Sequence, residues 1–316
     1  MSFKDYNELM INGLPLKGNE IIRYCERSDS EYIKKIGRFI AEWLDDRPSI
    51  NLKTSGSTGA PKTIPAKKNN MLQSAKATAL YFDFKPGQNA LLCLPVDYIA
   101  GKMMIVRALY SRLNLICIAP SLSPLKEIPV DLVIDFAPLT PMQLHGTGNT
   151  GSIRKILLGG GPVSAELEQA SQTLEAAIFH GFGMTETLTH IALRRINGNN
   201  RSPVYHGLEG VRFTTDDRDC LIIRVPFLPE PIVTNDVVEL INEQSFIWKG
   251  RADHAINSGG IKLFPEEIEK KLGTILSNRF FIAGLPDNIL GEKLCLFIEG
   301  MTFDMEKMSA LRKQID

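Results

Sequence analysis

A loop rich in glycine, serine and threonine carries the first residues that could do chemistry. Its two glycines free the backbone to curl so that successive N–H groups converge on an anion, and its hydroxyls and lysine add further donors. These features suit a polyphosphate, although a polar surface turn has a similar composition. The loop is no Walker A motif, because counting from Gly56 places Pro61 where the second glycine must stand. The candidate residues are Thr54, Ser55, Gly56, Ser57, Thr58, Gly59 and Lys62.

A second group of candidate residues lies at 180–187. Phe182 offers a flat face for a base, Thr185 a hydroxyl for a phosphate, and Glu186 a hard carboxylate of the kind that Mg²⁺ prefers. Three glycines and a proline at 159–162 form a turn upstream of this group. The alternative interpretation of 180–187 is a strand-to-helix turn with a threonine as its N-cap.

Four segments of the chain resemble motifs of the adenylate-forming superfamily, which contains acyl-CoA synthetases, luciferase-like enzymes and peptide-synthetase adenylation domains. Residues 54–62 resemble its phosphate loop, and 181–187 its aromatic-Gly-x-Thr-Glu motif. Residues 234–236 resemble its Thr-Gly-Asp, with Asn235 in place of glycine, and 248–269 its hinge with the loop that follows. Because the motifs stand in the family's order over about two thirds of the chain, the chain is identified as a member.

The resemblance implies that the chain binds ATP, Mg²⁺ and CoA. An acid attacks the α-phosphate of ATP to form an acyl-AMP and pyrophosphate, and the CoA thiol then displaces AMP. Thr185, Glu186 and Lys62 would be catalytic, with Glu186 on the metal, and Asp253 would be the hinge pivot. The other implied residues are Gly160, His180, Gly181, Phe182, Gly183, Met184, Asp236 and Arg251 for ATP, and Gly259 and Gly260 for the loop on the CoA side.

The acid site is expected around residues 94–107, which resemble a stretch of the o-succinylbenzoate–CoA ligases, with Tyr98 in place of their histidine. Arg107 is a cation within an otherwise apolar helical pattern, and a fixed guanidinium is a natural bidentate partner for the second carboxylate of such a substrate. The alternative is that Arg107 lies on the solvent side of an amphipathic helix. The predicted acid-binding residues are Tyr98, Gly101, Lys102, Arg107, Gly159, Gly160, Thr189 and His190.

One element of the family's pattern is missing from the sequence. The family supplies a lysine for adenylation from a Pro-x-Ser/Thr-x-x-Gly-Lys segment near its C-terminus, and residues up to Asp316 contain no such segment. We therefore expect the 316-residue chain to bind ATP but to adenylate poorly. Restoring the segment should accelerate the first half-reaction by about 10²-fold, the scale of losing one preorganised charge stabiliser.

Composition narrows the function classes. Hydrophobic residues make up 44% of the chain and the formal net charge is zero, which favours a globular enzyme over a partner of nucleic acid or membrane. The start of the chain lacks the pattern of a signal peptide, and five scattered cysteines without a C-x-x-C pair indicate a reducing cytoplasm with neither disulfides nor zinc. We expect a monomer or homodimer acting on small molecules.

Alternation of strand and helix patterns predicts an α/β fold. We expect a large adenylate-forming core of mostly parallel sheets with helices plus a small distorted β-barrel at 1–250. A small, truncated α+β C-terminal domain lacking the lysine segment is expected at 251–316. Helices are predicted at 31–44, 67–82, 98–110, 164–177 and 266–276, and strands at 90–95, 114–119, 131–136 and 155–160, with short strands from about 204 onward.

The leading functional hypothesis is an ATP-dependent acid–CoA ligase with o-succinylbenzoate, an intermediate of menaquinone biosynthesis, as the acid. A fatty or aryl acid–CoA ligase of other specificity is the alternative within the same chemistry. A nucleotide-binding protein of the same fold with weak turnover is an alternative from another class. A P-loop kinase or NTPase is the last option, and Pro61 argues against it.

Overall fold

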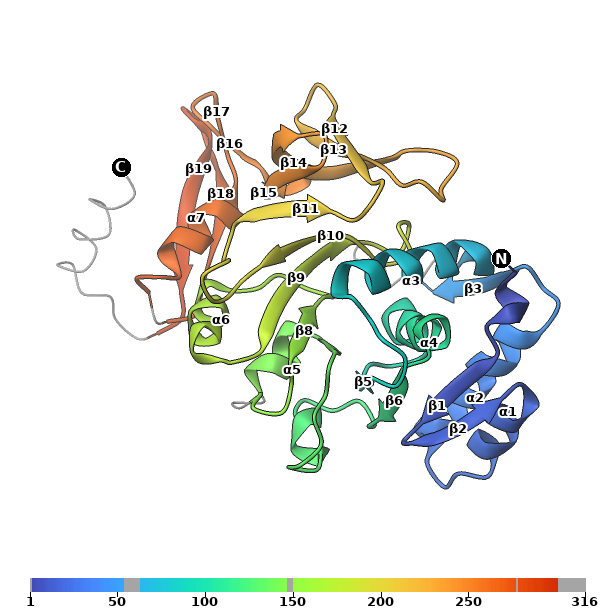
Figure 1. Ribbon diagram of the computed structural model, residues 1–316. Helices are drawn as coiled ribbons and strands as arrows, with labels where there is room; N and C mark the ends of the chain where they lie inside the picture. Colours follow the sequence, from blue (N-terminus) through green and yellow to red (C-terminus); the bar gives the residue numbers. More distant parts are fainter. Residues whose placement is uncertain (1, 54–62, 147–149, 277, 301–316) are drawn as a thin grey trace.

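The computed structural model describes residues 2–53, 63–146, 150–276 and 278–300, and these fold into a mixed α/β architecture (Figure 1). The predicted fold class is thereby confirmed. The first sheet has the order β2-β1-β6-β5. Its strands are β1 (Glu8–Ile11), β2 (Leu14–Lys17), β5 (Asn89–Leu92) and β6 (Asn114–Cys117), and a separate hairpin joins β3 (Ser49–Lys53) to β4 (Thr63–Lys67).

The helix predicted at 31–44 is present with those bounds as α2 (Glu31–Leu44). Its N-cap Ser30 accepts a hydrogen bond from the Ile33 backbone N–H, and an apolar stripe that includes Ile36, Ile40 and Trp43 is buried.

Other short helices are α1 (Asn19–Glu26) and α5 (Pro141–His145), and the 3₁₀ turns include η1 (Phe3–Asp5), η2 (Pro124–Glu127) and η4 (Ala252–His254).

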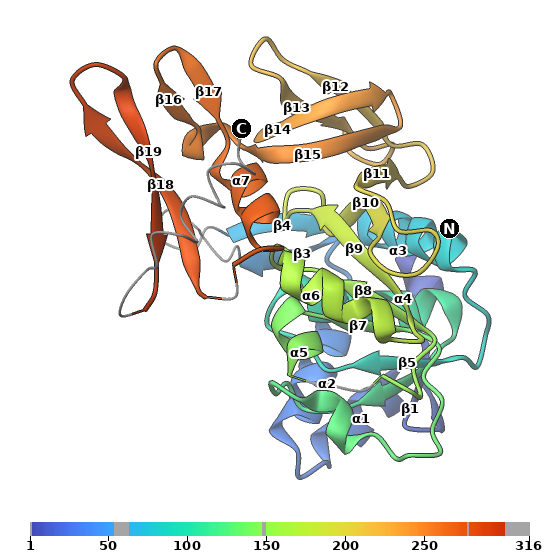
Figure 2. The ribbon, with the colours of Figure 1, turned by 90° about the vertical axis from the view of Figure 1, so that its left-hand side faces the viewer.

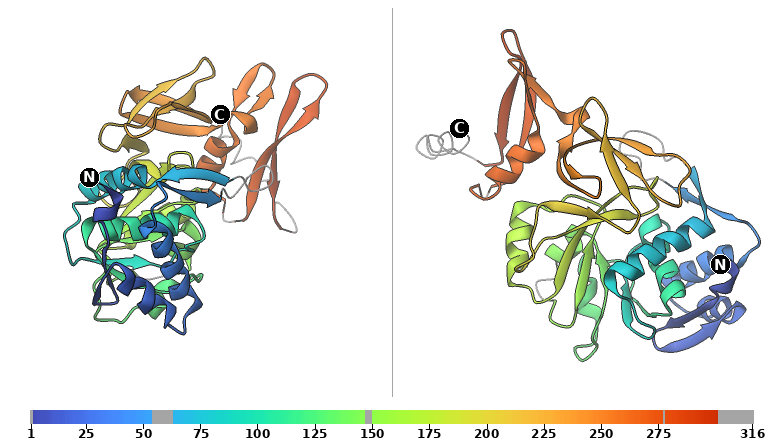
Figure 3. Two further views of the ribbon diagram at one scale, coloured as in Figure 1. Left: turned by 90° about the vertical axis from the view of Figure 1, so that its right-hand side faces the viewer. Right: turned by 45° about the horizontal axis from the view of Figure 1, so that its top comes forward.

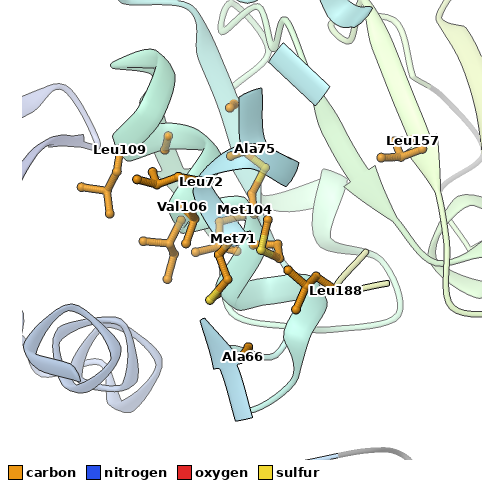
Figure 4. Packing of buried hydrophobic residues seen from close by; sticks show 14 of the residues in the cluster. Ala66, Met71, Leu72, Ala75, Met104, Val106, Leu109, Leu157 and Leu188 are labelled. Atoms are coloured by element: carbon orange, nitrogen blue, oxygen red, sulfur yellow. The ribbon is translucent and has the colours of Figure 1, made fainter. Parts of the chain in front are cut away.

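Two helices cross the middle of the larger hydrophobic core. They are α3 (Lys68–Phe82) and α4 (Ile99–Ser111), close to the predicted 67–82 and 98–110. Every residue from Met103 to Leu109 is buried, so α4 meets protein on all sides. Figure 4 shows Met71 of α3 beside Met104 of α4 in this cluster, which also includes Leu188.

A nine-stranded sheet of order β12-β13-β14-β15-β11-β10-β9-β8-β7 forms the centre of the molecule. Only β7, β8 and β9 run parallel, and every pairing from β9 to β12 is antiparallel. The strands are β7 (Ala137–Leu139), β8 (Lys155–Leu158), β9 (Ala177–Gly183), β10 (His190–Arg195), β11 (Val204–Gly207), β12 (Arg212–Thr215), β13 (Cys220–Arg224), β14 (Ile232–Asn242) and β15 (Ser245–Arg251).

The expected small barrel is not closed. Among the described residues, no pairing joins β12 back to another part of the sheet, so β12 to β15 extend the central sheet as an antiparallel meander. The expectation of mostly parallel sheets is likewise too simple, because antiparallel pairs predominate. Short hairpin connections allow only antiparallel neighbours. They join β9 to β10 and β10 to β11, and later the consecutive strands from β12 to β15.

Three predicted elements differ from the structure, and one of them, the helix expected at 266–276, ends at Leu272. The helix expected at 164–177 ends early, as α6 (Ala165–Ala170) followed by the 3₁₀ turn η3 (Ser171–Thr173). The Asn197 side-chain amide donates to the carbonyls of Ser171, Leu174 and Ala176 at 3.3, 3.2 and 2.8 Å. It thereby occupies the Ser171 carbonyl, which a longer helix would have paired with the N–H of residue 175. The strand expected at 131–136 is reduced to single bridges at Ile134 and Phe136.

The last part of the chain forms a sheet of its own, with the order β17-β16-β19-β18 and the helix α7 (Pro265–Leu272) against it (Figures 2 and 3). Its strands are β16 (Ile256–Ser258), β17 (Ile261–Leu263), β18 (Phe280–Asp287) and β19 (Gly291–Ile298). A separate core includes Ile256, Leu272 and Ile282. β15 ends at Arg251, next to the predicted boundary. None of the helices in the described ranges is long and apolar enough to cross a membrane.

Gly101 allows α4 to begin close to the segment after β5. A Cβ at this position would lie 2.5 Å from the Pro95 carbonyl oxygen, which is backbone and cannot move freely. We predict that Gly101→Ala lowers the free energy of unfolding in urea by about 1–3 kcal/mol, the usual cost of overpacking. Ser111→Ala is the control on the same helix, because the Ser111 hydroxyl is buried without a partner and its loss should leave stability unchanged or raised. Equal stability of Gly101→Ala and the parent chain would contradict the packing role.

Candidate functional site

Two turns that the sequence singled out lie at the same edge of the central sheet. β8 and β9 are parallel, with Leu158 paired to His180, so the glycine turn at 159–161 and the loop at 184–189 both follow the carboxyl ends of neighbouring strands. That edge is where open α/β sheets bind their ligands. Gly160 has a φ of +80°, a conformation that favours glycine, and a Cβ at Gly159 or Gly161 would meet no atom of the described residues within 4 Å. The turn therefore presents bare backbone to open space.

The loop at 184–189 is a hairpin connection between β9 and β10, so its interpretation as a strand-to-helix turn is wrong. Buried Thr187 braces it from inside: its hydroxyl accepts from the Met184 N–H at 2.9 Å and lies 2.7 Å from the Thr189 carbonyl oxygen. Thr185 is half-buried and Glu186 is exposed. The arrangement holds the backbone still while it leaves the Thr185 hydroxyl and the Glu186 carboxylate available to a ligand.

Phe182 stands on β9 with its ring packed edge-on against neighbouring aromatic rings. Its centroid lies 5.1 Å from that of Phe246 and 5.7 Å from that of Tyr205. The side chain is only partly buried. The predicted stacking of Phe182 on adenine stays a prediction, as do the contacts of Gly181, Gly183 and Met184 with the nucleotide.

His180 uses both of its ring nitrogens within the protein. Nε2 lies 3.1 Å from the Gly161 carbonyl oxygen and Nδ1 lies 2.8 Å from the Tyr205 hydroxyl. Since a carbonyl only accepts, Nε2 carries the proton and Nδ1 accepts from tyrosine. Burial, reinforced by the charge of Arg194, lowers the pKa of His180 to about 4, so the ring is neutral at pH 7. The structure therefore shows His180 bound to the glycine turn, a contact that the sequence did not indicate.

Arg107 is 2% exposed, and the alternative that it lies on the solvent side of its helix is wrong. Its Nη2 donates to the Thr189 hydroxyl at 2.8 Å and lies 3.4 Å from His190 Nδ1, while its Nε donates to the Thr78 hydroxyl at 3.3 Å. Thr78 gives its own proton to the Ser74 carbonyl at 3.1 Å, so it also accepts from His190 Nε2 at 3.2 Å. α4, α3 and the 184–189 loop are thereby tied together.

The guanidinium of Arg107 is buried without a countercharge. Within the described ranges, it forms no ion pair with Asp or Glu, and its hydrogen bonds use Nε and Nη2 but not Nη1. Burial lowers its pKa to about 9, which still leaves it charged at pH 7. Burial and the charge of Arg107 hold the pKa of His190 well below its ordinary value, so His190 is neutral. A buried, unpaired cation of this kind is costly unless an anion completes it.

The other predicted acid-site residues are not brought to this cluster. Tyr98 is the half-exposed N-cap of α4, and Gly101 packs against Pro95. The Lys102 ammonium lies 3.4 Å from the Glu42 carboxylate and 5.1 Å from the centre of the Phe39 ring, both on α2. Their assignments to the acid site remain predictions, with Lys102 already engaged elsewhere.

Asp236 and Arg251 face each other across β14 and β15. Asp236 is buried, which raises its pKa, and Trp248 Nε1 donates to its Oδ1 at 2.9 Å. Arg251 forms a two-pronged pair with Asp253, at 3.0 Å for both contacts. The Asp236 carboxylate, predicted to bind ATP, is therefore oriented by an indole, and the predicted hinge residue by an arginine.

The remaining predicted residues lie apart or outside the described ranges. Gly259 and Gly260, with φ of +58° and +84°, form the tight turn between β16 and β17. The phosphate-loop candidates at 54–62, Lys62 included, follow β3 and lie outside the described residues. No group of three His, Cys, Asp or Glu side chains in the described ranges could hold a metal ion by itself. Exposed Glu186 suits Mg²⁺, which commonly takes one or two carboxylates together with substrate phosphates.

Comparison with known proteins identifies the class. The sequence model of the AMP-binding enzyme family matches residues 45–209, which is more than half of the chain, and the chain belongs to this family. A solved structure of an acyl-CoA synthetase (AMP-forming)/AMP-acid ligase II-like protein from Dyadobacter fermentans is 33% identical, covers 94% of this chain and 88% of its own, and superimposes with a TM-score of 0.69. The predicted family membership is thus confirmed.

Curated relatives carry a more specific name. The 2-succinylbenzoate–CoA ligase of Listeria monocytogenes is 24% identical over 92% of this chain and 68% of its own length. That of Haemophilus influenzae is 27% identical over 71% of this chain and 53% of its own. This chain therefore spans about half to two thirds of the length of these two relatives. The o-succinylbenzoate CoA synthetase of Bacillus subtilis, solved with its acyl-adenylate, is 19% identical with a TM-score of 0.71, which shows a shared fold.

Trp248 should matter to nucleotide binding through Asp236. We predict that Trp248→Phe, which keeps an aromatic ring but removes the donor, weakens AMP binding about tenfold, because hydrogen bonds to charged groups contribute about 1.5–3 kcal/mol. Isothermal titration calorimetry measures the affinity. Trp43→Phe is the matched control, since the Trp43 indole donates to the Tyr6 carbonyl at 3.1 Å and should not influence AMP. An equal loss of affinity in both variants would show that Trp248 acts only through stability.

The neutral state of His180 predicts a pH dependence of folding. Its pKa is about 4 in the folded chain and near 6.5 when unfolded, so the unfolded state takes up more protons as the pH falls between these values. Stability is therefore full above about pH 6.5 and declines toward pH 4, by at most about 3 kcal/mol from this residue. In urea titrations from pH 7 to 4, His180→Gln should flatten this decline. A decline as steep as that of the parent would contradict the assignment.

Proposed function

We propose that this chain carries the acid- and ATP-binding site of an ATP-dependent acid–CoA ligase, which forms an acyl-AMP and then a CoA thioester. The acid that we propose is a dicarboxylate with an aryl group, and o-succinylbenzoate is the best single candidate. The observation that carries the proposal is Arg107, a buried guanidinium beside the 184–189 loop that has no countercharge among the described residues. Family membership and the names of the curated relatives support the same chemistry.

The 184–189 loop links the two halves of the proposed chemistry. Thr185 and Glu186 would receive the α-phosphate and its Mg²⁺, which neutralises charge that develops on the phosphoryl oxygens. Thr189, three residues after Glu186, accepts a hydrogen bond from Arg107 Nη2. An acid whose distal carboxylate binds Arg107 through Nη1, which has no partner in the described part of the chain, would thus lie against the loop that carries the predicted phosphate ligands. Arg107 would bind and orient the acid, and the other carboxylate would react.

The chemistry of Arg107 also separates the alternatives. A fatty or simple aryl acid has one carboxylate, which is consumed in the reaction, and gives a buried guanidinium no anion. Charge-assisted hydrogen bonds between guanidinium and carboxylate are strong and directional, so a second carboxylate is the better match. We further propose a reducing cytoplasm as the compartment, because all five cysteines are free.

Arg107→Met tests the proposal with binding as the readout. The ligands are sulfamate analogues of the acyl-adenylate, one with a free distal carboxylate and one with that carboxylate as its methyl ester. We predict that Arg107→Met weakens the free acid at least tenfold and leaves the ester within about twofold. Its free energy of unfolding should stay equal or rise, because a buried, unpaired charge is removed. Arg212→Met, at an exposed arginine on β12, is the control.

ATP–pyrophosphate exchange then tests the reaction itself. We expect exchange to depend on a dicarboxylic aryl acid among a panel that includes benzoate and fatty acids. Exchange driven equally well by acids with one carboxylate would favour a ligase of other specificity. Tight AMP binding in a chain extended by the family's lysine segment, with neither pyrophosphate exchange nor discrimination between the two analogues, would favour a nucleotide-binding protein of the same fold. Equal loss of both analogues in Arg107→Met would contradict the role of Arg107.

A further inference from the structure

A directional row of hydrogen bonds crosses the central sheet to the glycine turn. Arg194 Nε donates to the Tyr205 hydroxyl at 3.3 Å, Tyr205 donates to His180 Nδ1 at 2.8 Å, and His180 Nε2 donates to the Gly161 carbonyl at 3.1 Å. The residues come from β10, β11, β9 and the turn after β8. Arg194 is paired with His180 across β9 and β10, so neighbouring strands place these side chains together.

The far end of this row is anchored by a buried ion pair. Arg194 donates to both carboxylate oxygens of Glu168 on α6, at 3.4 and 3.0 Å, and the two side chains are 7% and 5% exposed. Arg201 adds a third contact at 2.9 Å. Burial alone would raise the pKa of Glu168, but the hydrogen bonds and charges of Arg194 and Arg201 lower it, so the carboxylate is ionised. Such a pair is rigid, because separating it would leave a buried charge unpaired.

The row and the polypeptide together form a closed ring. The chain runs from Gly161 through the N-cap Ser164, whose hydroxyl accepts from the Leu167 N–H at 3.1 Å, into α6 and on to Glu168. The side chains then lead back through Arg194, Tyr205 and His180 to Gly161. The segment between Gly161 and Glu168 is therefore held at both ends against β9, β10 and β11.

We propose that Tyr205 and His180 are positioning residues, whose hydrogen bonds hold the glycine turn in the place that receives the acyl-adenylate. The turn needs such support because side-chain packing could not hold it: a Cβ at Gly159 or Gly161 would meet no described atom within 4 Å. The Gly159 N–H donates to the Leu139 carbonyl at 3.1 Å, and the His180 bond to Gly161 holds the other end of the turn. Glycine gives access to the backbone but loses the most conformational freedom on ordering, and the carbonyl bond at Gly161 offsets part of that loss. The functional half of this inference rests on the proposed adenylation.

Tyr205→Phe removes one hydroxyl and retains the ring. Its effect is measured by hydrogen exchange and by ATP–pyrophosphate exchange. Hydrogen exchange by mass spectrometry should show faster exchange in peptides covering 156–167, with those of α4 unchanged. ATP–pyrophosphate exchange should show a rise of roughly fivefold in the KM for the acid with kcat altered less than twofold, the size expected from one neutral hydrogen bond. His180→Gln keeps a donor for Gly161 and should lose less than His180→Leu.

Tyr32→Phe is the matched control for the loss of a buried hydroxyl. Tyr32 is 9% exposed, against 6% for Tyr205, and donates to the Leu94 carbonyl at 2.8 Å on another part of the fold. Unchanged hydrogen exchange at 156–167 in Tyr205→Phe would contradict the proposal that Tyr205 holds the glycine turn. Faster hydrogen exchange at 156–167 with an unchanged KM for the acid would contradict the role of Tyr205 in acid binding. Absence of pyrophosphate exchange in a parent chain extended by the family's lysine segment would count against the proposed function instead, while the hydrogen-exchange comparison would still test whether Tyr205 holds the glycine turn.

Discussion

The parallel pairing of β8 with β9 is the constraint on which the rest of the site depends. Parallel strands end at the same edge, so one register brings the glycine turn beside the loop that carries Thr185 and Glu186. The loop is then closed by β10, which pairs back along β9 and carries both His190 and Arg194. A slip of one residue would turn these side chains to the opposite face of the sheet. The buried residues of β8 and β10 oppose such a slip.

Two buried arginines on either side of this pairing behave differently. Arg194 has a carboxylate, Glu168, and its charge is balanced inside the fold. Arg107 has only two hydroxyls and a neutral imidazole, none of which carries negative charge. The Arg194–Glu168 pair is balanced in charge and stabilises the fold. The charge of Arg107 is not balanced by any described residue, so an anionic ligand could pair with it. This contrast is the physical basis for treating Arg194 as the anchor of the row that reaches the glycine turn, and for proposing Arg107 as the residue that binds substrate.

The nucleotide side of the site is connected to the last part of the chain by one strand pair. β14 carries Asp236 and β15 carries Trp248 and Arg251, and the two strands hold these residues within one ladder. Arg251 is also the last residue of β15 and donates hydrogen bonds to the Asp253 carboxylate. Asp236, predicted to bind the nucleotide, and Asp253, the predicted hinge, are therefore connected through the paired strands β14 and β15.

The sequence by itself determined the family, the α/β class and the places of the site turns, because glycines, hydroxyls and acids at set spacings are local signals. It also predicted α2 with its bounds, since the cap and the apolar stripe lie within one segment. Other features depend on partners that are distant along the chain. The early end of α6 depends on Asn197, and the antiparallel meander replaces the expected barrel only through strand pairing. Helical periodicity could not show whether Arg107 meets solvent. Tyr205 carried no signal, and Trp248 was noted only as the first residue of the hinge motif, because an aromatic residue gains a bonding role only when folding brings it to His180 or Asp236. Tertiary structure decided these points, since burial and the pairing of polar groups exist only once the chain has folded.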